Sequence, residues 1–334
     1  RQRKRSVFSM RRFIPLTAII FFATFAGSAQ APATSLEGVN RFDAAPAKGF
    51  NYPYYLYVPP AFFEAEAKGK ERTILVLPNN TGKNDDDLAV HEADVMRRIN
   101  QNSRFVSDVV VAILTPVFPR PATDWKTYTH ALDRDTMTTA KAEKKDYARL
   151  DLQLIAMIDD ARERLADGPG LKFDRRVLML GFSASGMFVN RFTFLHPNRV
   201  KAAIVGSPGG WPIVPAASYK EKTLRYPIGV ADLRSVTGND LDLKTLRGVP
   251  MFVFLGDKDD NDSVAFDDSY DKEDRELIFP LLGEKPVDRW GAAREMYIAA
   301  GLNAEFKLYP GIGHTITLDI RNDILAFLKR HLSE

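Results

Sequence analysis

The sequence has 334 residues, no cysteine, and 46 Lys and Arg against 43 Asp and Glu, a formal net charge of +3. Without cysteine, disulfide bonds, thiolate metal sites and lipid anchors on cysteine are excluded. Part of the positive charge lies in the first twelve residues, so the rest is nearly neutral and gives no indication of nucleic-acid binding. Roughly 300 residues remain after an N-terminal segment, enough for one large α/β domain.

Residues 11–31 have the order of a secretory signal peptide. They begin with two arginines, continue with an apolar stretch over 13–26, and end in Ala-Gln-Ala, which predicts cleavage after or near Ala31. The apolar stretch is short for a membrane span, so we expect no membrane anchor after cleavage. Residues 1–9 are interpreted as an upstream extension of this signal. The prediction is an exported protein of a bacterial periplasm or culture medium.

The remaining chain is expected to hold a flexible lead-in over 32–49 and one domain over 50–334. Within the domain, apolar runs indicate strands and amphipathic runs indicate helices. The predicted strands cover 50–58, 73–77, 106–114, 177–181, 201–205, 251–255 and 304–309, with an extra one suggested at 226–230. The predicted helices cover 86–100, 149–165, 184–196, 286–300 and 318–332.

Strands that alternate with helices predict a mostly parallel sheet covered on both faces. In such sheets, ligands bind beyond the carboxyl ends of the strands. The long irregular stretch 118–147 follows one strand there, and a loop of that length is usually functional or mobile. The mixed stretch 206–247 is interpreted as a small insertion over the same edge.

Residues 181–186, Gly-Phe-Ser-Ala-Ser-Gly, join a predicted strand directly to a predicted helix. A turn this tight needs small neighbours and presents Ser183 at a helix N-terminus, where negative charge is favoured. Ser185 stands where a second glycine is usual, and Gly186 follows it. Ser183 is therefore a candidate nucleophile, and the alternative is a serine that only caps the helix.

A serine nucleophile needs a base, and the five histidines can be compared by position. His91, His196 and His331 fall within or at the ends of predicted helices. His314 follows a strand and a Gly-x-Gly turn, on the same sheet edge as Ser183, and is the preferred base. His130 lies in the long loop and stays open as an alternative.

The base needs a carboxylate to orient it, and the acidic run 257–262 follows the strand before His314. Asp259 is preferred because about three residues are needed to turn back toward the histidine, and Asp257 and Asp260 are the alternatives. The run also resembles a calcium loop, but it lacks the glycine and the closing glutamate of that motif. We predict no metal and no cofactor.

An oxyanion needs two backbone N–H donors. The Ala184 N–H follows the nucleophile, and the turn after strand 73–77 offers Asn80 first and Thr81 second. Four aromatic residues in loops near this edge are candidates for a substrate wall, with packing inside the loops as the alternative. These residues are Trp125, Tyr128, Trp211 and Phe266.

The order Ser183, Asp259, His314, each after its strand, resembles the α/β-hydrolase superfamily over about residues 52–331. The aromatic strand before Pro59, the turn at 77–82 and the elbow at 181–186 are similar to secreted esterases and poly(3-hydroxybutyrate) depolymerase-like proteins. The resemblance implies an α/β-hydrolase fold with a Ser-His-Asp triad.

The leading functional prediction is a secreted serine hydrolase that cleaves small or polymeric carboxylic esters through an acyl-enzyme. A peptidase or amidase with the same triad is the first alternative. A hydrolase fold without activity, serving as a binding module, is the second.

Overall fold

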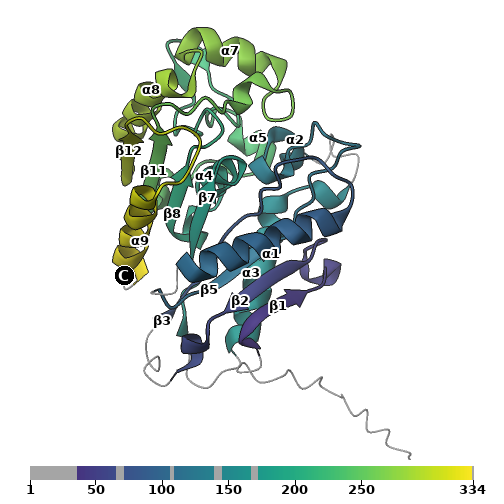
Figure 1. The fold of residues 1–334 in the computed structure, drawn as a ribbon. Helices are drawn as coiled ribbons and strands as arrows, with labels where there is room; N and C mark the ends of the chain where they lie inside the picture. Colours follow the sequence, from purple (N-terminus) through teal and green to yellow (C-terminus); the bar gives the residue numbers. More distant parts are fainter. Residues whose placement is uncertain (1–35, 65–70, 106–108, 139–144, 167–171, 333–334) are drawn as a thin grey trace, which may run out of the picture. The chain divides into compact units, whose positions relative to one another are not determined.

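The computed structural model describes residues 36–64, 71–105, 109–138, 145–166 and 172–332. The signal peptide predicted over 1–31 lies outside these ranges. The described chain is built on an eight-stranded sheet with the order β1-β2-β5-β4-β7-β8-β11-β12 (Figure 1). The strands are β1 Gly38–Phe42, β2 Tyr54–Val58, β4 Ile74–Val76, β5 Ala112–Pro116, β7 Val177–Phe182, β8 Val200–Gly206, β11 Met251–Gly256 and β12 Ala304–Tyr309. The strands β5, β4, β7, β8, β11 and β12 run parallel, and β2 is antiparallel to both β1 and β5.

The helices follow the strands in the alternation that the sequence predicts. They are α1 Leu88–Phe105, α2 Arg134–Met137, α3 Leu150–Ala166, α4 Ala184–Leu195, α5 Leu233–Thr237, α6 Leu243–Leu246, α7 Lys272–Leu282, α8 Pro286–Ala299 and α9 Leu318–Leu332. Short 3-10 turns occur at Pro46–Lys48, Pro60–Phe63, Thr129–Ala131, Lys145–Tyr147, Pro197–Arg199 and Ser263–Ala265. Two further strand pairs are β3 Glu71–Arg72 with β6 Lys172–Phe173, and β9 Ser218–Tyr219 with β10 Lys222–Thr223.

The central strands are apolar throughout because both faces of the sheet are covered. Alternate side chains of one strand enter opposite core layers, since successive strand residues point to opposite faces. In β11, Val253 packs in the layer that contains residues of α3, α4 and α8, whereas Phe252 and Phe254 pack in the layer that contains α9. Helix α1 adds Val95 and Ile99 to a third cluster beside β2. Within the described ranges, no helix has the length and apolar composition that a membrane span requires.

The structure corrects two expectations about secondary structure. The flexible lead-in was wrong for residues 38–42, which form β1 and pair with β2 along their whole length. The sequence pattern does not indicate this strand, because it lies at the sheet edge and polar residues such as Arg41 face away from the core. The extra strand suggested at 226–230 was also wrong, because these residues form turns.

The insertion after β8 is packed into the core of the domain. Ile213, Val214, Leu224 and Ile228 are fully buried and belong to the same cluster as α3 and α4. The Tyr226 hydroxyl donates to the Leu132 carbonyl at 2.5 Å, which joins the insertion to the loop after β5. The insertion is therefore part of the domain core.

Candidate active site

Ser183 occupies the sharp corner between β7 and α4. Its backbone has φ 62° and ψ −130°, a combination that non-glycine residues rarely adopt and that concentrates at functional sites. The Ser183 N–H donates to the Gly206 carbonyl of β8 at 3.0 Å, which anchors the corner to the sheet. The Ser183 side chain makes no capping hydrogen bond to α4. The capping alternative is therefore wrong, and the hydroxyl is available at the start of the helix.

Ser185 and Gly186 together meet the packing requirements that a second glycine usually meets in such an elbow. The Ser185 hydroxyl accepts from the Phe182 N–H at 3.0 Å and donates to the Phe182 carbonyl at 2.9 Å, which closes the elbow. Gly186 supplies the close approach of α4 to β8, because a Cβ there would lie 2.4 Å from the Gly206 carbonyl oxygen. Gly181 is equally constrained, since its Cβ would lie 2.1 Å from the Ser185 carbonyl oxygen. The serine at position 185 is thus compatible with a tight elbow.

We expect Gly186→Ala to lower the free energy of unfolding by about 2–4 kcal/mol, because the new methyl group collides with a central strand that cannot move aside. The matched control is Gly291→Ala in α8, where a Cβ meets nothing within 4 Å. Replacing glycine by alanine in an open helix position should raise stability by about 1 kcal/mol. Urea unfolding of both variants checks the prediction, and equal effects of the same sign would contradict it.

The structure brings His314 and Asp259 together at the carboxyl edge of the sheet. The His314 Nδ1 lies 3.0 Å from Oδ1 and 2.9 Å from Oδ2 of Asp259. The His314 ring also packs on Phe182, the residue before Ser183, with 4.6 Å between ring centroids. Because Nδ1 is engaged by the carboxylate, Nε2 is the nitrogen left to accept a proton. Among the described residues, no hydrogen bond joins that ring to the Ser183 hydroxyl, and such bonds are often long before substrate binds.

The contacts of Asp257, Asp259 and Asp260 show which of these three carboxylates orients His314. Asp259 is 3% exposed and bonds to His314. Asp257 instead accepts from the Gly311 N–H at 2.7 Å, and Asp260 is exposed. The Lys258 N–H donates to the Ile312 carbonyl at 2.9 Å. These bonds join the loop after β11 to the loop after β12, which fixes the distance between the Asp259 and His314 backbones.

Asp259 is held as a carboxylate by its hydrogen bonds. Burial alone would raise its pKa, but hydrogen bonds from His314 and from the Ser207 side chain outweigh burial and keep the pKa below its ordinary value. The Asn261 N–H adds a third bond at 3.0 Å. Ser207 is buried, follows β8 with φ 41°, and was missed by the sequence analysis. Only the spatial neighbourhood of β8 and β11 reveals it.

The other end of this loop is fastened by Arg289 of α8, which is 1% exposed. Its guanidinium donates to both carboxylate oxygens of Asp262, at 2.9 Å and 2.8 Å. It also donates to the carbonyls of Gly210 and Gly283, at 3.2 Å and 2.8 Å. A bidentate pair of this kind is among the stronger protein hydrogen bonds, so the Asp259 loop is held at both ends.

The turn at 78–82 follows β4 and lies against the elbow. The Asn80 side chain donates to the Phe182 carbonyl at 3.3 Å, which brings this turn to the residue before Ser183. Within the described ranges, the Asn80 backbone N–H has no acceptor. The Ala184 N–H belongs to the first turn of α4 and has no intrahelical partner either. Both N–H groups that the sequence analysis selected are therefore unengaged, and the Thr81 hydroxyl bonds to His91 at 2.8 Å.

His130 supports this turn through buried hydrogen bonds and is not a second base. It is 1% exposed, and burial lowers its pKa to about 3. Its Nε2 lies 2.8 Å from the Phe118 carbonyl and 3.1 Å from the Asn79 side-chain nitrogen. His196 bonds to Asp151 at 2.7 Å, away from the elbow. The sequence analysis left His130 open as an alternative base, and its burial shows that this alternative was wrong.

Comparison with known proteins shows which fold class this architecture belongs to. No protein-family model matches the chain, and no curated protein matches it significantly. A poly(aspartic acid) hydrolase from Sphingomonas sp. KT-1 superposes with a TM-score of 0.54 and 18% identity, over 89% of this chain and 99% of that chain. A poly(3-hydroxybutyrate) depolymerase from Bordetella parapertussis gives a TM-score of 0.54 and 17% identity, over 88% and 90%. The chain has the α/β-hydrolase fold.

The fold class that the sequence predicts is confirmed, and the resemblance holds at the level of the fold. In this α/β-hydrolase fold, the elbow, the acid loop and the histidine loop follow β7, β11 and β12, which all belong to the parallel part of the sheet. The turn at 78–82 follows β4, the neighbour of β7 on the other side. All the candidate site residues on these four loops therefore meet at the same edge.

The four aromatic candidates divide into two buried and two exposed residues. Trp211 is 1% exposed and its indole N–H donates to the Ile228 carbonyl at 2.9 Å, so its expected role in a substrate wall was wrong. Tyr128 is 7% exposed and lies under the Arg120 guanidinium, 4.1 Å from its ring centroid. Trp125 and Phe266 are 44% and 63% exposed and can still contact a ligand.

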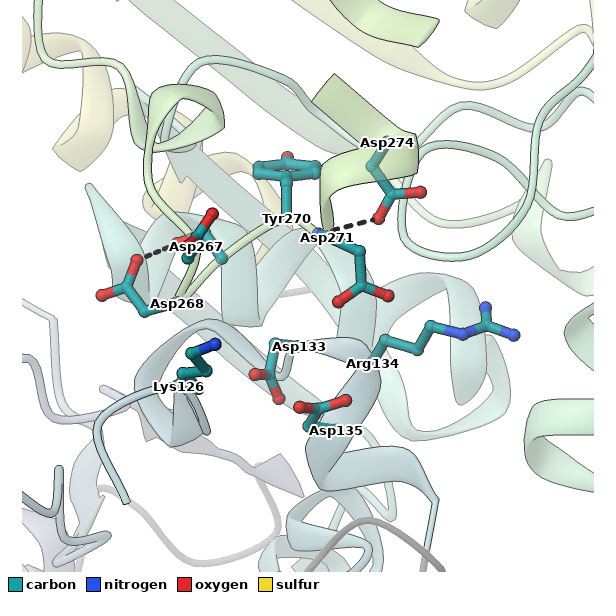
Figure 2. A pocket seen from close by; sticks show the side chains of 10 residues that line it. Lys126, Asp133, Arg134, Asp135, Asp267, Asp268, Tyr270, Asp271 and Asp274 are labelled. Atoms are coloured by element: carbon teal, nitrogen blue, oxygen red, sulfur yellow. Dashed lines mark hydrogen bonds between the residues drawn. The ribbon is translucent and has the colours of Figure 1, made fainter. Parts of the chain in front are cut away.

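The acidic stretch of the α/β-hydrolase domain forms ion pairs. Figure 2 shows carboxylates from two segments of the chain, 133–135 and 267–274, around a small pocket whose volume of about 10 Å³ leaves room for about one water molecule. The lining residues are Lys126, Asp133, Arg134, Asp135, Asp267, Asp268, Ser269, Tyr270, Asp271 and Asp274. Asp268 pairs with Arg120 and Asp274 with Arg225. Over the part of the chain that the structure describes, no three acidic or histidine side chains group as metal ligands.

Proposed function

We propose that this protein is a serine hydrolase that cleaves carboxylic esters through an acyl-enzyme. A single observation carries the proposal. His314 is hydrogen-bonded to Asp259, and the His314 ring packs on Phe182, the residue before Ser183. The strained corner at Ser183 supports the proposal, because backbone strain at a half-buried serine that makes no capping bond has no evident structural purpose here.

In the proposed reaction, the Ser183 hydroxyl attacks the ester carbonyl while His314 Nε2 accepts its proton. The tetrahedral oxyanion receives hydrogen bonds from the Ala184 and Asn80 N–H groups. His314 then gives the proton to the leaving alcohol, which leaves an acyl group on Ser183. Water repeats the sequence with the same base, and the acid is released. Asp259 orients the imidazole and stabilises its positive charge throughout.

The substrate of this reaction is proposed to be a small or polymeric ester with apolar groups near the cleaved bond. The exposed side chains of Trp125 and Phe266, on the loops after β5 and β11, support contacts with such groups. Export through the segment 1–31 belongs to the same proposal, because it would deliver the enzyme to substrates outside the cytoplasm.

We expect the mature chain to hydrolyse p-nitrophenyl acetate and butyrate with a kcat/KM at least about 100-fold above that for alanine p-nitroanilide. That ratio corresponds to about 2.7 kcal/mol in activation free energy. The control is the same preparation after stoichiometric reaction with a fluorophosphonate, which should have lost both activities. A preference for the anilide would favour the peptidase. A protein that neither cleaves esters nor reacts with the fluorophosphonate would be a binding module.

A further inference from the structure

Arg98 of α1 contacts the turn at 78–82. Its Nη2 donates to the Asn80 carbonyl at 2.5 Å, and its Nε donates to the Asp94 carboxylate at 2.7 Å. Asp94 is buried, and the Arg98 side chain is 25% exposed. A guanidinium that is oriented by a buried carboxylate makes a strong, directed hydrogen bond to a backbone carbonyl.

This bond fixes one peptide plane in the turn. The peptide between Asn80 and Thr81 is planar, so its carbonyl and its N–H point in opposite directions. With the Asn80 carbonyl held toward Arg98, the Thr81 N–H is directed away from α1. A peptide flip would reverse the two groups, and a carbonyl oxygen would replace an N–H on the far side of the turn. Such a replacement is repulsive wherever an oxyanion forms nearby.

The same turn is held at two further points. The Asn79 side chain donates to the Phe118 carbonyl at 2.7 Å and accepts from the Phe118 N–H at 3.2 Å. The Asn80 side chain is bound to the Phe182 carbonyl, which also accepts from Ser185. The Asn79 bonds bind the turn to the loop after β5, and the Asn80 bond binds it to the elbow. Of the three attachments, the Arg98 bond is the one that acts directly on a backbone carbonyl of Asn80.

We propose that Arg98 is a positioning residue for oxyanion binding: by holding the Asn80 carbonyl, it prevents a flip of the peptide between Asn80 and Thr81 and so keeps a carbonyl oxygen out of the oxyanion site. The inference rests on the proposed function of the site. Oxyanion hydrogen bonds strengthen only as negative charge develops, so their loss lowers kcat and leaves substrate binding nearly unchanged. Arg98 touches neither Ser183 nor His314 in any described contact, so its effect runs through Asn80.

The test compares Arg98→Met with Arg97→Met. Arg97 is the neighbouring arginine on α1, also pairs with Asp94, and is 62% exposed without a described bond to the turn. We expect Arg98→Met to lower kcat for p-nitrophenyl acetate by about 10- to 100-fold, with KM within about twofold of wild type. Arg97→Met should stay within about twofold in both. Inhibition by a phenylboronic acid, which forms a tetrahedral anion on the serine, should weaken in Arg98→Met in parallel with kcat/KM.

Arg98→Lys keeps the charge but can donate only as a single flexible point, so we expect a kcat between wild type and Arg98→Met. It also keeps the test decisive where the methionine variant folds poorly. A purely structural role would lower the melting temperature and the fraction of protein labelled by fluorophosphonate, with kcat per labelled site unchanged, and would overturn the inference. An inert wild type would instead reject the proposed function itself, and the inference with it.

Discussion

The Ser183→Ala variant is expected to lose ester hydrolysis by about 10⁴-fold or more and to take up no fluorophosphonate. The reason is that no other described hydroxyl combines a strained corner, a helix N-terminus and a neighbouring histidine that is bonded to a carboxylate. Mass spectrometry of the labelled wild-type chain should find the modification on the peptide that contains residue 183.

Ser185→Ala is the matched control for this experiment, because it removes a hydroxyl two residues away in the same elbow. Its hydroxyl accepts from the Phe182 N–H and donates its proton to the Phe182 carbonyl, so that proton is not directed at a base. We expect this variant to be labelled, with a free energy of unfolding lower by about 1–3 kcal/mol from the unpaired Phe182 groups. Labelling of Ser183→Ala at residue 185 would show that the elbow had been assigned to the wrong serine.

Asp259→Asn is expected to lower kcat by about 10⁴-fold while the chain keeps its fold. The carboxylate accepts from the His314 Nδ1–H, which leaves Nε2 free to take a proton. An amide at this position can present its own N–H groups to Nδ1, which favours the imidazole tautomer that cannot act as a base. It also removes the negative charge that stabilises the imidazolium. Steady-state kinetics with p-nitrophenyl acetate measures the loss.

Two neighbouring variants make this prediction specific. Asp260 is exposed, so Asp260→Asn should leave kcat within about twofold. Asp257 binds the Gly311 N–H at the base of the histidine loop, so Asp257→Asn should have an intermediate effect. A larger loss in Asp257→Asn or Asp260→Asn than in Asp259→Asn would mean that another carboxylate orients the base.

Elements with strong periodicity are predicted well from the sequence. The buried strands β7 and β11, the edge strand β12 and the helices α3, α8 and α9 lie within a residue or two of their predicted bounds. Their apolar runs and amphipathic faces are local properties that tertiary contacts reinforce. Helix α7 was not predicted, because its turn-rich acidic approach and the internal Pro280 disguise its start and interior. The strand β1 was missed because pairing with β2, rather than its own pattern, makes it a strand.

The site is predicted as far as chain order can reach. Ser183, Asp259 and His314 each follow a recognisable strand, and their shared sheet edge follows from the parallel topology. Arg98 and Ser207 carry no such signal, because their importance depends on contacts with Asn80 and Asp259 that no sequence pattern encodes. Trp211 is the opposite case, because the sequence analysis gave it a role in substrate binding although it is buried. An aromatic residue in a loop is exposed only if the loop does not fold back onto the core.

The order of the strands has a consequence for how activity appears while the chain is made. The proposed nucleophile follows β7, whereas its base follows β12, which pairs only with β11 in the described sheet. A ribosome releases β7 long before β12, so a partly synthesised chain can shape the elbow without yet being able to activate the serine. Under the proposed function, hydrolysis becomes available only when β12 has added to the sheet. The last docking step of the sheet would thus protect the cell from premature esterase activity.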